Sequence, residues 1–160
     1  MKKLVIAVAL LFAAAFCAGA QNLSVLSKAA RMAYDFLQKE GYKPYLDEDD
    51  DVVFTAGGYT FYVDNTPDDD TYLGIVMPYL MEVDSDDLLA TFAAMAACNE
   101  ITREKKLVQA YISDDGDVMF CADTYIGSAG NMNEFLDTAI DFMIRGLSSF
   151  SDLYNEYMED

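Results

Sequence analysis

Apolar side chains recur at two different spacings along the chain, and these spacings mark helices and strands. Between residues 22 and 40, apolar positions return every three or four residues, which is typical of an amphipathic helix that ends before Gly41. The same spacing predicts two more helices, over about 85–101 and about 132–158. The middle of the 85–101 segment is apolar on nearly every side, so we expect that helix to be buried all round.

Five short segments rich in β-branched and aromatic residues predict strands. They cover residues 52–56, 59–63, 72–79, 107–112 and 117–122. The Gly57-Gly58 pair between the first two segments is typical of a hairpin turn, and hairpins favour antiparallel pairing. The sequence therefore predicts an α+β fold of order α-β-β-β-α-β-β-α, in which a mostly antiparallel five-stranded sheet packs against helices.

Several predicted strands are apolar on both of their faces. Successive side chains of a strand point to opposite sides, so Phe61 and Tyr62 belong to different faces of the sheet. Met119 and Phe120 are divided in the same way. A sheet with one solvated face would be polar at every second position. We therefore expect the second face to be covered, either by a helix or by a partner.

The first twenty residues have the three-part pattern of a cleavable signal peptide. Two lysines precede an apolar run of 13 residues, and Ala18-Gly19-Ala20 supplies the small residues of a cleavage site. The run is shorter than the roughly 20 residues that a membrane-spanning helix needs. We expect residues 1–20 to be removed on export, and residues 21–160 to form one domain in the periplasm or outside the cell.

Charge and composition narrow the classes of function. Residues 21–160 contain eight basic and 28 acidic side chains, which gives a formal charge of −20. This charge repels nucleic acid and anionic lipid surfaces, and it favours solubility or a basic partner. The whole chain lacks histidine, the commonest general base and a frequent zinc ligand. We expect a protein that is not an enzyme and carries no cofactor.

Aspartates gather in the predicted turns, as in Asp47 to Asp51 and Asp68 to Asp70. Aspartate is a good turn former, so these clusters fit solvated connections between strands. Oxygen-rich loops also bind Ca²⁺, although no cluster here has the spacing of an EF-hand. A small-ligand or Ca²⁺-binding envelope protein is therefore the alternative to a protein-binding one.

Two cysteines, Cys98 and Cys121, lie outside the expected signal peptide. An oxidising compartment permits a disulfide between them. Both are flanked by apolar residues, which equally permits two buried free thiols. The sequence leaves these two alternatives open.

The last predicted helix is longer than the sheet it packs on. Its 27 residues span about 40 Å, whereas a six-residue strand spans about 20 Å. Phe150, Tyr154 and Tyr157 lie late on its apolar stripe. We expect them, with Tyr62 on the second sheet face, to form a partner surface, in a homodimer or with another protein.

The element order and several local patterns resemble the YbjN family and the type III secretion chaperone-like fold. The matching pieces are Glu40-Gly41-Tyr42, the acidic turn 47–51 before Val52-Val53-Phe54, Asp70 to Leu73, and Cys98-Asn99-Glu100-Ile101. The likeness covers about residues 23–157. It implies a non-enzymatic protein, often dimeric, that acts on other proteins. The combined prediction is an exported, non-catalytic, chaperone-like or regulatory domain of the cell envelope that binds an unidentified protein.

Overall fold

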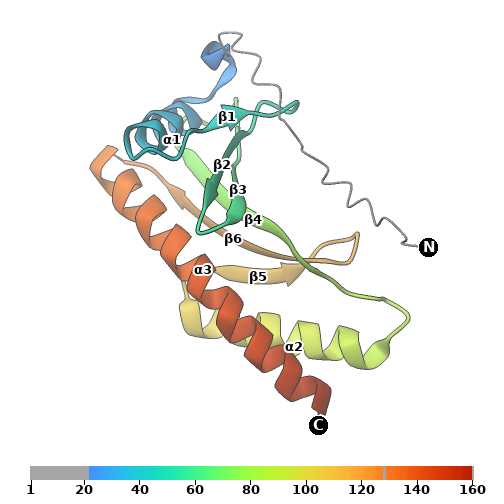
Figure 1. Cartoon of the computed structure of the whole chain (residues 1–160). Coiled ribbons are helices and arrows are strands. Elements are labelled where there is room, and N and C mark those ends of the chain that lie inside the picture. Colours follow the sequence, from blue (N-terminus) through green and yellow to red (C-terminus); the bar gives the residue numbers. More distant parts are fainter. Residues whose placement is uncertain (1–21, 128, 160) are drawn as a thin grey trace, which may run out of the picture.

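The structure, a computed structural model, describes residues 22–127 and 129–159 (Figure 1). The expected signal peptide, residues 1–20, lies outside the described residues. The described chain contains three α-helices and a six-stranded sheet of order β1-β2-β3-β4-β6-β5. Every pair of neighbouring strands is antiparallel, which confirms the predicted α+β class.

The strands lie close to the predicted segments. They are β1 (Tyr45–Leu46), β2 (Val52–Ala56), β3 (Tyr59–Val63), β4 (Tyr72–Glu82), β5 (Gln109–Ile112) and β6 (Asp117–Tyr125). The sequence did not predict β1, because only two residues pair and the acidic turn follows directly. Strands β4 and β6 exceed their predicted lengths because they pair with each other from Tyr72 to Glu82. An irregularity interrupts this pairing where Tyr79 adopts a φ of 56°.

The helices are α1 (Lys28–Lys39), α2 (Leu88–Lys105) and α3 (Ala129–Glu159). Side-chain N-caps determine where α1 and α2 begin. The N–H of Ala30 donates to Oγ of Ser27 at 3.1 Å, and the N–H of Leu89 donates to Oδ1 of Asp87 at 3.0 Å. Helix α1 therefore begins later than predicted, and Asn22 caps a short 3₁₀ turn over Leu23–Val25 instead.

Helices α1 and α3 pack on one face of the sheet, and α2 lies beside α3 along the edge strand β5 (Figure 1). There the N–H of Ala110 donates to Oγ1 of Thr102 at 2.9 Å.

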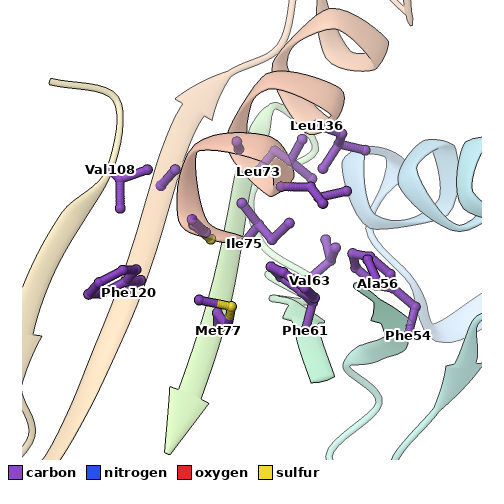
Figure 2. Close-up of a cluster of buried hydrophobic side chains, with 14 of the residues drawn as sticks. Phe54, Ala56, Phe61, Val63, Leu73, Ile75, Met77, Val108, Phe120 and Leu136 are labelled. Carbon is purple, nitrogen blue, oxygen red and sulfur yellow. The ribbon is translucent and has the colours of Figure 1, made fainter. Parts of the chain in front are cut away.

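Alternate residues of the strands, such as Ile75 and Phe120, point to the face that α1 and α3 cover and are fully buried. Figure 2 shows them meeting Leu136 of α3 in a continuous apolar cluster. Helix α3 approaches β6 closely at Gly146, where an added Cβ would lie 3.1 Å from the ring of Phe120. The apolar cluster therefore fixes the positions of the helices on the sheet.

No described helix covers the opposite face of the sheet. A row of cross-strand neighbours runs over that face through all six strands: Tyr45, Val53, Tyr62, Val76, Cys121 and Gln109. Val53 is only 1% exposed although it points away from the helices, because two tyrosines flank it in this row. The sequence predicted that either a helix or a partner covers this face. Among the described residues, no helix does so.

Candidate protein-binding surfaces

Helix α2 exposes an apolar stripe on its outer side. Leu88, Phe92 and Met95 are 81%, 61% and 60% exposed, and their spacing places them on one face of the helix. The buried residues of α2 lie on its other side and are mostly alanines. Small residues let α2 pack closely against β5 and α3, while the large apolar side chains face solvent. The expectation that this helix is buried all round is therefore wrong.

The end of α3 packs beside this stripe, because α2 and α3 are in contact (Figure 1). The ring of Tyr157 lies edge-on to Phe92, with centroids 6.3 Å apart. Tyr154 stacks on Phe150 at 6.2 Å, and Phe150 in turn lies edge-on to Phe120 at 6.1 Å. Tyr154 and Tyr157 are half-buried, but Phe150 is only 2% exposed. The expectation that Phe150 belongs to a partner surface is therefore corrected, since it is a core residue.

We define the α2 face by the stripe, its neighbour Leu89 and the ring that extends it: Leu88, Leu89, Phe92, Met95 and Tyr157. Acidic residues precede the stripe, and both acidic and basic residues follow it, with Arg103 paired to Glu100 one turn before it. Asp86 stands nine residues before Met95, and Arg103 stands eight residues after it. Asp86 and Arg103 thus stand at nearly equal distances from Met95, the last residue of the stripe.

The open sheet face contains a second candidate surface, a groove of about 520 Å³. We call it the tyrosine–aspartate face. Four aspartates, three tyrosines and three apolar residues line it: Asp47, Asp49, Asp51, Asp64, Tyr62, Tyr79, Tyr111, Val76, Pro78 and Met119. Tyr62 lies here, on the second sheet face as the sequence predicted. Burial raises the pKa of Tyr62, and neighbouring tyrosines and aspartates raise it further.

Asp64 belongs to this face and packs over a glycine of the next strand. Its N–H donates to the carbonyl of Gly74 at 3.1 Å, and a Cβ at residue 74 would overlap its Oδ2. Burial raises the pKa of the Asp64 carboxyl, and the charges of Asp51 and Asp123 raise it further. Burial also raises the pKa of Asp51, although the N–H of Asn65, 2.7 Å from its Oδ1, opposes the shift.

The acidic turn before β2 uses its carboxylates internally. The N–H groups of Asp49 and Asp51 donate to Oδ1 of Asp47 at 3.0 and 2.9 Å. Across residues 22–127 and 129–159, no three acidic or cysteine side chains are grouped to hold a metal ion. This geometry favours the turn-forming interpretation of the cluster over Ca²⁺ binding.

The two cysteines lie on different elements, α2 and β6. Cys98 is buried on α2, whereas Cys121 alternates with the core-facing Phe120 and so points to the open face. Both thiols are free, which favours the free-thiol alternative over the disulfide. Burial raises the pKa of each thiol to about 11. A thiol with such a pKa is protonated at neutral pH and is a poor nucleophile.

These features define the class of the protein: an α+β domain with an antiparallel sheet, helices packed on one of its faces, an exposed apolar helix face and an open second sheet face. The chain belongs to the YbjN family, because the model of that family matches residues 32–153. The family is described as "Putative bacterial sensory transduction regulator". The match confirms the resemblance drawn from the sequence.

Solved structures are similar to this chain at low sequence identity. The crystal structure of YbjN from E. coli, a "putative transcription regulator", has a TM-score of 0.54 and 13% identity, covering 72% of this chain and 85% of that one. The type III secretion chaperone SycH of Yersinia pestis, in complex with a stable fragment of YscM2, has a TM-score of 0.45 and 10% identity, covering 71% and 94%. An uncharacterized protein from Methanothermobacter thermautotrophicus has a TM-score of 0.49 and 9% identity, covering 78% and 97%.

No curated protein sequence matches the chain. Within the part of the chain that the structure describes, no helix is long and apolar enough to cross a membrane.

Proposed function

We propose that this chain is an exported, non-catalytic, protein-binding domain of the cell envelope that works as a homodimer. A chaperone-like or regulatory role fits its family. The observation that supports the proposal is the solvent exposure of Leu88, Phe92 and Met95, which are 60–81% exposed. Contiguous apolar patches of large side chains mark interaction sites on soluble proteins. The α2 face is the contact between the two copies.

The charges at the ends of α2 favour a second copy of the chain as the occupant of the α2 face. In a twofold-symmetric pair of antiparallel α2 helices whose axis passes near Met95, Asp86 of one copy lies beside Arg103 of the other. The helix dipoles also oppose each other in this arrangement, with each positive N-terminus beside a negative C-terminus. A parallel arrangement would place like charges together.

Two sequence features support export and a non-catalytic role. Residues 1–20 have the pattern of a signal peptide, so the exported chain begins at Gln21. The chain has no histidine, and both described thiols have raised pKa values. Intact mass of the protein from an envelope fraction tests export. A mass that begins at Gln21 supports it, and a full-length chain in the cytoplasm contradicts it.

Sedimentation equilibrium of residues 21–160 at micromolar concentration tests the dimer. The wild type is expected to have twice the mass of the chain. Phe92→Glu places a charge in the middle of the α2 face and is expected to give a monomer. Tyr125→Glu is the matched control, because Tyr125 is 73% exposed on β6, outside the α2 face, and should leave the dimer intact. A monomeric wild type, or a dimeric Phe92→Glu variant, contradicts the proposal.

A further inference from the structure

The tyrosine–aspartate face combines three chemical properties. Carboxylates of Asp47, Asp49, Asp51 and Asp64 line it, tyrosine rings stand among them, and Val76, Pro78 and Met119 form apolar parts of the lining. Its volume of about 520 Å³ lies within the range of about 300–1,000 Å³ that is usual for ligand sites. It therefore offers charge, ring faces and apolar surface within one groove.

Among the described residues, no lysine or arginine lines this groove. No lysine or arginine occurs between Lys43 and Arg103, a stretch that contains β1 to β4, and none occurs in β5 or β6. The ion pairs of the described residues join neighbouring turns of helices, as Arg31 does with Asp35 at 3.1 Å. The negative charge of the tyrosine–aspartate face therefore favours a positively charged partner.

We propose that the tyrosine–aspartate face binds a lysine- or arginine-bearing segment of a partner protein. The cationic head of such a side chain donates charge-assisted hydrogen bonds to the carboxylates. It also lies favourably over the face of a tyrosine ring. Its aliphatic stem covers the apolar residues of the groove while the charge meets the acids. This inference rests on the proposed protein-binding function and adds the chemistry of the partner.

The negative charge of the tyrosine–aspartate face disfavours a second copy of the same face as its occupant. Two tyrosine–aspartate faces placed together would bring like charges into contact, which disfavours their association. The two proposed surfaces also lie on different elements: the α2 face on helices α2 and α3, and the tyrosine–aspartate face on the uncovered side of the sheet (Figure 1). Met95 and Tyr111 line a common pocket beside β5, so the two surfaces meet there. The four aspartates lie near β1 to β3 at the other end of the sheet, so a dimer through α2 leaves the carboxylates available.

Fluorescence anisotropy with a labelled octapeptide of alternating lysine and threonine tests the inference at low ionic strength. The dimeric protein is expected to bind this peptide, to ignore the matching glutamate–threonine peptide, and to bind less tightly as salt rises. Asp51→Asn with Asp64→Asn should weaken binding about tenfold, since two charge-assisted contacts are lost. Each asparagine keeps an oxygen that can accept a hydrogen bond, and circular dichroism checks that the fold persists.

Two matched variants separate a site from general acidity. Asp114→Asn with Asp115→Asn removes the same charge from the turn between β5 and β6, outside the groove. Measured at about 0.15 M salt, where the Debye length is about 8 Å, it should weaken binding less than Asp51→Asn with Asp64→Asn does, because exposed charges farther away are screened. Equal weakening by both pairs of substitutions would show a general charge effect and overturn the inference. Failure of the lysine peptide and of its arginine counterpart to bind would also overturn it.

Spermine distinguishes a protein segment from a free polycation. If spermine displaced the peptide at an equal concentration, a small polyamine would be the ligand and the inferred segment would be wrong. Phe92→Glu separates this inference from the dimer, because it disrupts only the α2 face and should retain peptide binding. A monomeric wild type that still binds the peptide would contradict the dimer alone. An intact dimer without peptide binding contradicts the groove alone.

Discussion

The ring of Phe92 on α2 lies edge-on to the ring of Tyr157 near the end of α3, with centroids 6.3 Å apart and planes at 82°. This pair joins the exposed stripe of α2 to the last turns of the longest helix. It explains how α3 extends past the sheet without leaving its end unsupported, because α2 packs against it (Figure 1).

The Phe92–Tyr157 pair predicts a measurable coupling energy. Edge-to-face aromatic pairs contribute about 0.5–1.5 kcal/mol beyond the area they bury. In a double-mutant cycle, Phe92→Ala and Tyr157→Ala should therefore be less destabilising together than the sum of the two single changes. Chemical denaturation at a fixed protein concentration measures the cycle. Strict additivity would show that the two rings do not stabilise each other.

Stability should rise as the pH falls below 7. The folded-state pKa values of Asp51 and Asp64 are raised above 3.8, so the folded chain binds more protons than the unfolded chain in this range. The free energy of unfolding should increase as the pH falls through the raised values and level off near 3.8. Hydrogen bonds from Thr71 lower the pKa of Asp69, whose contribution is lost only below this window. Thermal melts from pH 7 to pH 4 test the trend.

Asp64→Asn should flatten this pH dependence, because the neutral amide removes one of the two half-buried carboxyl groups whose pKa values are raised. Asp114→Asn, in the exposed turn between β5 and β6, is the control and should leave the slope unchanged. A melting temperature that drops on acidification in the wild type would mean that ion pairing outweighs the repulsion among the aspartates.

Gly146 should tolerate no large side chain. A Cβ there already lies 3.1 Å from the ring of Phe120, so Gly146→Val overpacks the contact between α3 and β6 and should destabilise by about 1–3 kcal/mol. At Gly130, in the first turn of α3, a Cβ meets nothing within 4 Å. Gly130→Ala should therefore be neutral or stabilising by up to about 1 kcal/mol. Urea denaturation compares the two, and equal effects would contradict the close approach of α3 to β6.

Both thiols should react slowly with iodoacetamide in the folded protein. Their pKa values of about 11 leave little thiolate at pH 8, so alkylation should be about 100-fold slower than for an ordinary cysteine. Unfolding in urea should restore the ordinary rate for Cys98 and Cys121 without any reductant. Thiols that stay unreactive in urea until a reductant is added would show that a disulfide forms.

Local patterns were sufficient to predict most elements of the fold. The Gly57-Gly58 hairpin, the end of α1 at Gly41 and the antiparallel strands all follow from residues close together in the sequence. The two-residue strand β1 could not be predicted from such patterns, because it is defined only by its pairing with β2. The start of α1 was misplaced because Asn22 and Ser27 both suit a cap, and the chain uses them for different turns.

The candidate surfaces were only partly predictable. Tyr62 was assigned to the second sheet face by alternation alone, and it lies there. The exposed stripe of α2 was not predicted, because apolar residues occur on nearly every side of this helix. The usable signal was side-chain size, because Leu88, Phe92 and Met95 share one face and the alanines the other. Phe150 was misassigned because it belongs to the same apolar stripe of α3 as the core residues. The sequence does not show at which residue of this stripe the contact with the sheet ends.

Native mass spectrometry of an equimolar mixture of two charge variants tests the antiparallel α2 dimer most directly. Asp86→Lys alone and Arg103→Glu alone each place like charges at both ends of the α2 contact, so each should dimerise weakly. In the mixed dimer both ends regain opposite charges, so the heterodimer should dominate the spectrum at low ionic strength. A statistical 1:2:1 distribution of the three dimers, or monomers alone while the wild type is dimeric, would contradict this arrangement.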